Sequence, residues 1–397
     1  MTEQGPGRSA RAAAAGDAGF DSIVVGAGLV GAAIAFGLAR AGQRVALLDE
    51  GDIAHRASRG NFGLVWVQSK GVGRPEYQRW TRESARAWKE LAAELHADTG
   101  IDTGLAQPGG LSFCLSEQEF EQRAALMRQL QREAGDFGFE FEMLRRSELA
   151  AQMPGLGPAV VGASFTPYDG HVNPLRLFRA LHQAAIRRGV AYVPGAVVQR
   201  TQASTSGFTV HTGAGRFSAA RLVLAAGLGN RELAPQVGLD CPVAPNKGQI
   251  LVTGKVSAVL SMPTEGIRQT DEGALLLGSS QEDAGCDDEA RQRTASAIAH
   301  RAVAVFPWIG ALRIVRSWAA LRVMTPDGLP VYEQSAQYPG AFVATCHSGV
   351  TLTAAHALAL APAIARGELP PAFAAYSARR FAAPRASHES PHVPRAA

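Results

Sequence analysis

The feature that most constrains this chain is a glycine-rich turn between an apolar strand and a helix of small residues. Residues 23–25, Ile-Val-Val, run directly into Gly-Ala-Gly-Leu-Val-Gly at residues 26–31. A small-residue helix to residue 41 and a second strand at 44–48 follow, and the acid Asp49 comes next. A Gly-x-Gly-x-x-Gly sequence in this order of strand, turn, helix, strand and acid is typical of units that bind dinucleotides. The same spacing alone occurs by chance in glycine-rich loops, so the flanking elements carry the prediction.

Each glycine of this turn has a physical role. Gly26 allows the tight turn, Gly28 lets the backbone approach a pyrophosphate, and Gly31 lets the helix pack closely on the strand. The first amides of the helix and its partial positive charge favour phosphates. Asp49 comes 18 residues after Gly31, where a carboxylate is able to accept hydrogen bonds from both hydroxyls of a ribose.

Three further stretches have the composition of cofactor-binding segments. The loop at 51–63 is small and polar, so it fits either a surface against a flat cofactor or an ordinary surface loop. The apolar strand at 221–227 ends in small residues, which lets a ligand approach the carboxyl edge of a parallel sheet. Residues 346–352 open the last predicted helix and offer a second set of helix amides to an anion.

The remaining periodicity predicts an alternation of helices and strands, which favours an α/β fold. Helices are predicted at 75–99, 116–133, 147–152, 174–188, 287–306 and 346–365. Strands are predicted at 64–68, 109–115, 139–144, 160–165, 191–193, 207–212, 221–227, 250–252, 273–279 and 341–344.

Length and charge exclude some classes of function. A chain of 397 residues exceeds the usual size of one core and predicts two domains. The net charge is +4, but residues 376–397 contain four arginines and one glutamate, which accounts for +3 of it. The rest of the chain is near neutral, so a solvated basic tail explains the charge better than binding to nucleic acid.

The cysteines and the termini narrow the setting. The four cysteines form no Cys-x-x-Cys pair, which argues against a metal or iron–sulfur site and fits a reducing compartment. We expect residues 1–19 to be a disordered leader and 383–397 a disordered tail. No stretch reaches the ~18 uninterrupted apolar residues of a spanning helix, and the nearest, 350–365, contains His356 and Pro362. A cytoplasmic protein is therefore expected, with membrane association left open.

Taken together, these motifs resemble the D-amino-acid oxidase family of flavoproteins, on its glycine oxidase and sarcosine oxidase side. The resemblance covers most of residues 20–380. It rests on five ordered motifs: the 26–31 turn with Asp49, Ser58-Arg59, Ala225-Ala226-Gly227, Trp318-Ala-Ala-Leu-Arg322 with Thr325-Pro326-Asp327, and His347-Ser-Gly349. Residues 59–70 and 346–352 look most like the branch of opine oxidases and D-hydroxyproline dehydrogenases.

The resemblance implies a discontinuous Rossmann-like FAD-binding domain with an inserted α+β substrate domain built on a mixed sheet. On this chain the FAD-binding domain would take residues 20–95, 155–235 and 310–382. The substrate domain would take 96–154 and 236–309. Partner subunits are implied for the opine oxidase branch.

The resemblance also implies which residues bind FAD. The start of the last helix would lie at the pyrimidine end of the flavin, where its dipole would stabilise the negative charge of the reduced ring. The implied residues are Gly26, Gly28, Leu29, Val30, Gly31, Asp49, Glu50, Ser58, Arg59, Asn61, Gly63, Leu64, Val198, Ala226, Gly227, Gly349, Val350, Thr351 and Leu352.

Three residues are implied as catalytic. Arg322 stands where glycine oxidases carry the arginine that binds the substrate carboxylate. The alternative for Arg322 is a structural ion pair, with Asp327 as the obvious partner. His347 is expected near the flavin, and His171 is either a substrate contact or a turn residue.

Two departures from the family pattern refine the expectation. Ala320 stands roughly where sarcosine oxidases carry the cysteine that bonds to flavin, so we expect non-covalent FAD. The strand at 275–277 has no lysine where sarcosine oxidases place one for oxygen activation, which favours a dehydrogenase.

The leading hypothesis is an FAD enzyme that takes a hydride from the carbon beside the amine of a small amino acid. A secondary or D-configured amine such as an opine or D-hydroxyproline is favoured, and glycine or sarcosine is the runner-up. A quinone, oxygen or a partner subunit would accept the electrons. A flavin-carrying electron-relay subunit is the alternative from another class. A pyridine-nucleotide disulfide reductase is disfavoured because the chain lacks a second glycine motif and a redox cysteine pair.

Four lesser residues have open roles. Trp318 is expected to pack rather than to take part in chemistry, and His55 to be solvated. Lys247 and Gln249 either line the substrate domain or lie on a strand edge.

Overall fold

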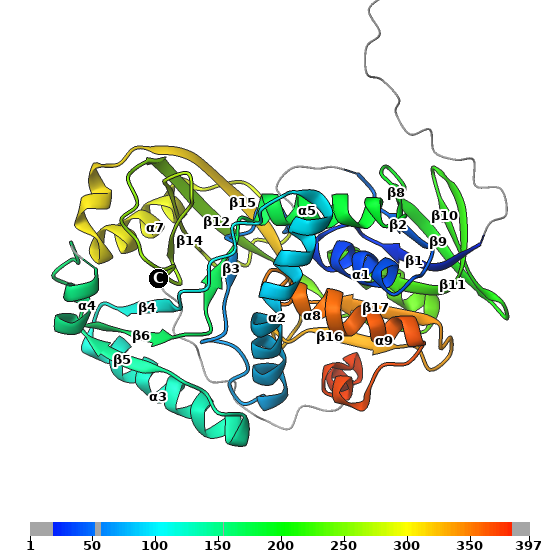
Figure 1. Ribbon diagram of the computed structural model, residues 1–397, viewed down its shortest axis with the longest axis horizontal. Helices are drawn as coiled ribbons and strands as arrows, with labels where there is room; N and C mark the ends of the chain where they lie inside the picture. Colours follow the sequence, from blue (N-terminus) through cyan, green and yellow to red (C-terminus); the bar gives the residue numbers. More distant parts are fainter. Residues whose placement is uncertain (1–18, 52–56, 154, 383–397) are drawn as a thin grey trace, which may run out of the picture.

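The computed structural model describes residues 19–51, 57–153 and 155–382. Its largest sheet has eight strands and lies on the right in Figure 1. The glycine-rich strand β1 lies in the middle of the order β16-β17-β11-β1-β2-β8, and the hairpin β9-β10 extends β11. The bounds are β1 Phe20–Val25, β2 Val45–Leu48, β8 Ala191–Val193, β9 Val198–Ser204, β10 Gly207–Thr212, β11 Gly215–Leu224, β16 Val331–Gln334 and β17 Ala341–Thr345. The strands β17, β11, β1, β2 and β8 are parallel, so their carboxyl ends share one edge.

A layer of helices covers one face of this sheet. Its members are α1 Leu29–Arg40, α2 Pro75–Thr99, α5 Pro174–Arg187, α8 Thr353–Ala355 and α9 Ala361–Arg366. The small residues of α1 allow close packing, because a Cβ at Gly37 would lie 2.2 Å from the carbonyl oxygen of Ala357. The helix α2 has the predicted bounds, since Pro75 begins it and Gly100, with φ +73°, ends it. A short helix, α6 Asn230–Leu233, follows β11.

The last predicted helix, 346–365, is broken in the structure. Residues 346–352 form turns, α8 begins at Thr353, and His356–Leu360 form a π-helical segment before α9. Pro362 has no amide hydrogen to donate to residue 358, so a regular α-helix cannot run through this point. A widened turn before a proline accommodates that lost bond.

The other half of the molecule, on the left in Figure 1, has two smaller sheets. The first is antiparallel, in the order β13 Ile267–Gln269, β14 Ala274–Gly278, β12 Ala244–Lys255 and β15 Ile314–Met324. The second contains β4 Gly110–Cys114, β6 Gly162–Thr166 and β5 Glu142–Arg145. The helices of this half are α3 Glu117–Ala134, α4 Arg146–Gln152 and α7 Gln292–Val305. A separate core of side chains from both sheets and from α7 stabilises it.

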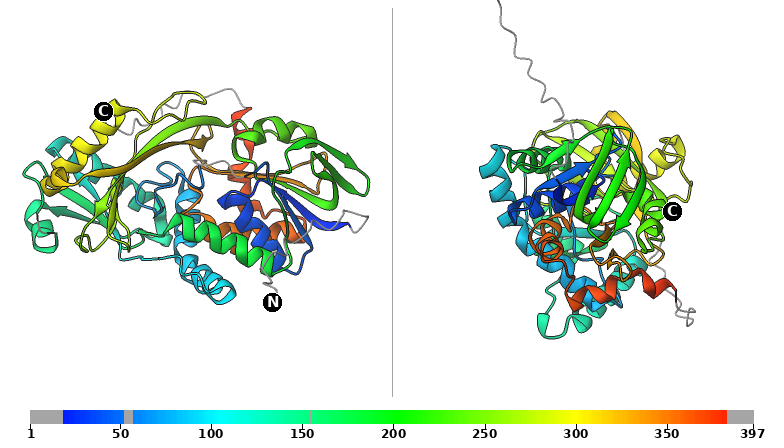
Figure 2. Two further views of the ribbon diagram at one scale, coloured as in Figure 1. Left: turned by 90° about the horizontal axis from the view of Figure 1, so that it is seen from above. Right: turned by 90° about the vertical axis from the view of Figure 1, so that its right-hand side faces the viewer.

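Two strands lie outside the predicted domain boundaries. Both β6 and β15 fall in segments expected in the FAD-binding domain, 155–235 and 310–382, but they pair with β4 and β5 and with β12 respectively. The boundaries followed the order of motifs along the chain, whereas sheet membership depends on a partner far away in sequence. Figure 2 shows the long β12–β15 pair running from the smaller half toward the large sheet.

A two-stranded ribbon joins the halves. It pairs β3 Leu64–Val65 with β7 Gly170–His171. The strand predicted at 64–68 is therefore shorter than expected, and the predicted helix 287–306 begins only at Gln292. Residues 1–18 of the predicted leader, the predicted tail and His55 lie outside the described residues. In the part of the chain that the structure describes, no helix combines the length and apolar character needed to span a membrane.

Candidate functional site

A long cleft runs between the two halves and passes the carboxyl edge of the large sheet. Its volume is about 2960 Å³, well above the ~300–1,000 Å³ of ordinary small-molecule pockets. The β1–α1 turn lies on its wall, and the β12–β15 pair and the turn at 346–351 line it as well. A cleft of this size is able to hold an extended cofactor and a substrate together.

The dinucleotide turn has the backbone that a pyrophosphate site needs. Gly26 adopts φ +96°, which favours glycine. A Cβ at Gly31 would lie 1.8 Å from the carbonyl oxygen of Gly26, so the first turn of α1 approaches the strand as closely as backbone allows. The Ser58 hydroxyl accepts a hydrogen bond of 2.9 Å from the amide of Leu29, which brings the predicted loop onto the start of α1.

The Asp49 carboxylate lies at the end of β2 and closes this turn. One oxygen accepts a hydrogen bond of 2.7 Å from the amide of Ala27, and the other accepts one of 3.0 Å from Gly51. Asp49 also lines the cleft, where a carboxylate is free to accept further hydrogen bonds from a ribose. It therefore both holds the turn and faces the proposed ligand, and the bond to Ala27 was not foreseen from the sequence.

We predict that Asp49→Ala weakens FAD binding roughly ten- to hundredfold, because hydrogen bonds to a charged acceptor contribute about 1.5–3 kcal/mol. The dissociation constant of FAD, measured by titrating the apoprotein with the cofactor, checks this. Asp21→Ala is the matched control, since Asp21 accepts its hydrogen bond from Arg44 and does not line the cleft. An unchanged dissociation constant for Asp49→Ala would exclude it as the ribose ligand.

Most residues predicted to bind FAD line the cleft. Those that do are Gly26, Gly28, Leu29, Val30, Asp49, Glu50, Ser58, Arg59, Asn61, Leu64, Val198, Ala226, Gly227, Gly349, Val350 and Thr351. Three do not line it: Gly31 packs on Gly26, a Cβ at Gly63 would meet the carbonyl of Val172, and Leu352 is fully buried in the core. Their positions fit support of the cleft wall rather than contact with a ligand.

The turn before α8 is joined to the β3 strand and to α2. The Thr351 hydroxyl accepts a hydrogen bond of 3.0 Å from the amide of Trp66 and donates one of 3.4 Å to the carbonyl of Leu64. Its carbonyl accepts bonds from the Ser84 hydroxyl and the Trp88 indole, at 2.7 and 3.1 Å. The sequence predicted Trp88 only as core, yet its polar atom helps to position this turn.

These observations fit FAD. A glycine cradle without room for a Cβ, the start of a twelve-residue helix and a carboxylate at the end of the second strand lie together on one wall. Residues of the loop 57–62 and of the turn at 349–351 lie on the same cleft. The residues that would hold the cofactor therefore come from separate segments that the fold brings together.

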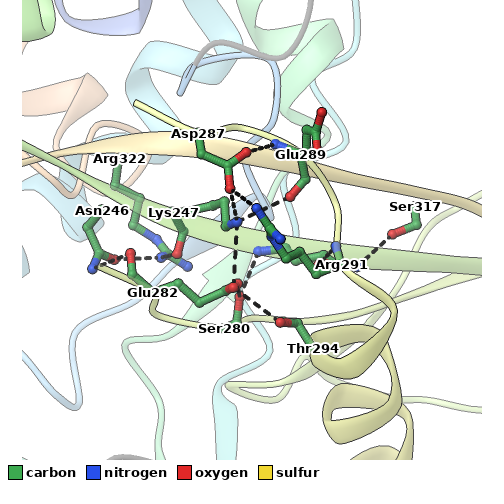
Figure 3. A network of polar contacts seen from close by, with 11 residues as sticks. Asn246, Lys247, Ser280, Glu282, Asp287, Glu289, Arg291, Thr294, Ser317 and Arg322 are labelled. Atoms are coloured by element: carbon green, nitrogen blue, oxygen red, sulfur yellow. Dashed lines mark hydrogen bonds and ion pairs between the residues drawn. The ribbon is translucent and has the colours of Figure 1, made fainter. Parts of the chain in front are cut away.

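Arg322 lies on β15 at the substrate end of the cleft. Its guanidinium donates hydrogen bonds of 3.0 Å to the side-chain oxygen of Asn246 and 3.2 Å to the carbonyl of Lys247 (Figure 3). It lies over Gly248, where a Cβ would come within 2.2 Å of it. Burial lowers the pKa of Arg322 to about 10, so it stays charged at neutral pH.

The alternative role for Arg322 as the partner of Asp327 is wrong. Asp327 binds Arg380 instead, with contacts of 2.8 and 3.1 Å. Among the residues that the structure describes, no carboxylate forms an ion pair with Arg322. A half-buried cation that lines a cleft and lacks a counter-charge favours an anionic ligand.

A buried polar network supports the strand behind Arg322. The Lys247 ammonium is 1% exposed, lies 3.1 Å from Asp287 and 3.6 Å from Glu282, and donates to the carbonyl of Glu289 (Figure 3). The Gln249 side chain accepts a hydrogen bond from the amide of Arg291 and donates one to Ser317. Neither residue lines the cleft, and both are buried, so they hold the segment 280–291 against β12.

The two predicted catalytic histidines differ in position. His347 lines the cleft, and burial together with the charges of Lys70 and Arg322 lowers its pKa well below the usual range. His171 does not line the cleft; it lies on β7, 3.4 Å from an Arg268 nitrogen, and burial lowers its pKa to about 4. Both imidazoles are therefore neutral at pH 7, and His171 lies away from the substrate end.

Two other residues stand out in this region. Trp318, predicted to pack, donates a hydrogen bond of 3.2 Å to the carbonyl of Gly60 and so joins β15 to the predicted cofactor loop. Lys70, which had no predicted role, lines the cleft near Arg322 and His347. Within the described residues, no group of three His, Cys, Asp or Glu side chains has the arrangement of a metal site.

Comparison with known proteins identifies the family. Residues 21–363 match the family described as FAD dependent oxidoreductase, DAO. One of the two kinds of chain that make up opine oxidase in Agrobacterium tumefaciens (strain Ach5) is 46% identical over 366 residues, which cover 92% of this chain and 99% of that protein. Glycine oxidase of Geobacillus kaustophilus (strain HTA426) is 30% identical over 363 residues, covering 88% and 94%.

The fold agrees with this similarity. The crystal structure of glycine oxidase from Geobacillus kaustophilus superposes with a TM-score of 0.81 at 28% identity, covering 89% of this chain and 96% of that one. The predicted α/β fold class, with its mixed sheet, and the predicted cofactor are confirmed. The chain belongs to the D-amino-acid oxidase family of FAD-dependent oxidoreductases.

Proposed function

We propose that this protein oxidises the carbon–nitrogen bond of a small amino acid. The observation that carries the proposal is Arg322, a charged guanidinium without a carboxylate partner among the described residues, on the cleft that begins at the dinucleotide turn. A guanidinium fork matches a carboxylate with two parallel hydrogen bonds. A substrate bound in this way presents its α-carbon in one orientation, which lowers the entropic part of the barrier.

Bound FAD would accept a hydride at flavin N5 from the carbon beside the amine. The chain's own residues bind and orient the substrate: Arg322 holds the carboxylate, and His347 presents a neutral imidazole to the cleft. No side chain has to remove a proton from the carbon if the amine enters neutral. The imine product would then be hydrolysed by water to a keto product and an amine.

The substrate we favour is a secondary or D-configured amine. The similarity to a component of opine oxidase supports an opine, an amino acid whose nitrogen carries a second acid-bearing chain. D-hydroxyproline is a further candidate of this kind, and glycine or sarcosine is the runner-up, supported by the similarity to glycine oxidase. The absence of lysine at 275–277 supports a dehydrogenase over an oxidase.

Because that opine oxidase relative is named as one subunit of its enzyme, the similarity supports partner subunits for this chain as well. In that case electrons would pass from the flavin to a partner rather than directly to oxygen. The second candidate function, a flavin-carrying electron-relay subunit, follows from the same observation. The two candidates differ in whether the isolated chain oxidises an amino acid itself.

An anaerobic reduction experiment separates these possibilities. The purified holoprotein is mixed without oxygen with glycine, sarcosine, D-amino acids, D-hydroxyproline or opines, and the flavin absorbance is followed. Bleaching by one of these amines is expected. If none bleaches the flavin while dithionite does, the isolated chain is an electron relay and the proposed activity is wrong.

The proposed cofactor attachment has its own test. We expect one FAD per chain, bound without a covalent bond, because Ala320 stands in place of the flavin-linking cysteine. Burial raises the pKa of the cleft-lining Cys346 thiol to about 12, so it stays protonated and is a poor nucleophile. Acid precipitation is expected to release all yellow colour into the supernatant, whereas a yellow pellet would contradict a non-covalent cofactor.

A further inference from the structure

Lys70 lies on a tight turn that follows the β3 strand and lines the cleft. Its amide donates a hydrogen bond of 2.9 Å to the carbonyl of Val67, which closes the turn. The next residue, Gly71, has φ +78°, and a Cβ there would lie 2.4 Å from the amide of Gln78 on α2. The backbone at Lys70 is therefore fixed between β3 and α2, and the side chain faces the cleft.

A buried network makes this turn rigid. The Asp169 carboxylate accepts hydrogen bonds of 2.5 Å from the amide of Val67 and 2.6 Å from the Gln68 side chain. The Arg123 guanidinium binds the Gln68 carbonyl and side-chain oxygen at 3.2 and 2.6 Å, and the Ser69 hydroxyl at 3.2 Å. Every residue from 67 to 69 is thus held by a polar contact, so Lys70 begins from a fixed position.

The Lys70 ammonium has no counter-charge of its own. Within the described residues it makes no side-chain hydrogen bond or ion pair. The two carboxylates that act on it are engaged elsewhere, Asp169 as above and Glu265 with the Ser112 hydroxyl at 2.5 Å. Burial lowers the pKa of Lys70, and the nearby charge of Arg322 adds to this.

Lys70 and Arg322 reach the same end of the cleft from different elements. Both positive charges act on the imidazole of His347, and each lines the cleft. Arg322 is on β15, in the smaller half, whereas Lys70 follows β3 at the junction of the halves. Two fixed cations around one neutral imidazole leave two positive charges to be balanced by a ligand.

We propose that Lys70 is a specificity residue that binds a second acidic group of the substrate, on the nitrogen substituent opposite the carboxylate held by Arg322. This rests on the proposed function and narrows its substrate class to secondary amines with an acid on both sides of the nitrogen. A single carboxylate fills the fork of Arg322 and leaves Lys70 unpaired. A dicarboxylate neutralises both cations, and a compact ammonium suits an acid at the end of a flexible chain.

The test uses two secondary amines that differ only by the second acid: sarcosine and iminodiacetate. Each is titrated into the holoprotein under anaerobic conditions. Binding is read from the change in Tm, and the dissociation constant and limiting rate of flavin reduction come from rapid mixing. The variants are Lys70→Met, Lys70→Arg and, as a matched surface control, Lys89→Met, which changes an exposed lysine of α2.

Lys70→Met is expected to weaken iminodiacetate binding at least about tenfold, as for loss of a charged hydrogen bond, and to change sarcosine binding less than about twofold. Lys70→Arg is expected to restore most of the affinity for iminodiacetate, and Lys89→Met to match the wild type. Arg322→Lys is expected to weaken both ligands.

Three results would overturn the proposal. They are equal weakening of both ligands by Lys70→Met, a change in the reduction rate alone, and wild-type protein that does not bind iminodiacetate. The proposed function fails separately, when the wild type binds these amines without reduction of its flavin, since the Tm change still decides the role of Lys70.

Discussion

Gly31→Ala is expected to yield a protein that retains little or no FAD. The added methyl group would lie 1.8 Å from the carbonyl oxygen of Gly26 and 3.3 Å from the Ala225 side chain. Neither the β1–α1 turn nor the middle of the large sheet has room to move, because Asp49 and the strand pairing fix both. Overpacking costs about 1–3 kcal/mol when neighbours adjust, and a backbone clash adds to it, so FAD affinity is expected to fall at least about a hundredfold.

The flavin-to-protein absorbance ratio of the purified variant, and its Tm with and without added FAD, check this. Gly254→Ala is the matched control, since no atom lies within 4 Å of a Cβ there and its φ is ordinary. It is expected to keep a full complement of FAD. A Gly31→Ala protein with a normal flavin ratio would show that α1 does not approach β1 as the structure has it.

Arg322→Met is expected to raise KM for a carboxylate substrate at least about a hundredfold while the protein keeps FAD. Loss of one partner of a buried charge pair costs about 2–5 kcal/mol. Arg322→Lys retains a charge but loses the fork, so a rise of about tenfold or more is expected. Small carboxylic acids such as benzoate, used as inhibitors, are expected to weaken in parallel in both variants.

The steady-state or reductive half-reaction kinetics with the best amine substrate measure this effect. Arg316→Met, an exposed arginine earlier on the same strand, is the control and is expected to behave as the wild type. A stable Arg322→Met variant with unchanged KM would remove Arg322 from the substrate site. A variant with lowered Tm and unchanged KM would instead assign it to the packing of β12 on β15.

The parts that the sequence predicts well are local in the chain. The turn at 26–31, Asp49 and α2 depend on glycine geometry, residue spacing and helix ends, all set within some twenty-five neighbouring residues. The cofactor residues could be named because four ordered segments resembled a known family. Most of them line the cleft, and Gly31, Gly63 and Leu352 support it from behind.

The parts that the sequence does not predict depend on distant partners. Asp327 was the nearest acid to Arg322 in sequence, but it binds Arg380, 53 residues further on. Lys247 is buried because segment 280–291 folds over β12, which no local pattern indicates. His171 was named for its motif, yet the β3–β7 ribbon turns it toward Arg268. Lys70 was quoted within a motif, but only the cleft shows what its side chain faces.

The contact between Arg322 and Gly248 has a consequence for descent. The guanidinium lies on the bare backbone of the neighbouring strand, with three of its atoms within 2.5 Å of where a methyl group would stand. Strand pairing places Gly248 opposite Ala320, two residues before Arg322, so the positions are adjacent in space although far apart in the gene. A lineage that gains any side chain at 248 has to displace or abandon the arginine. The two positions should therefore covary, and glycine at 248 should mark those descendants that still bind an acid through 322.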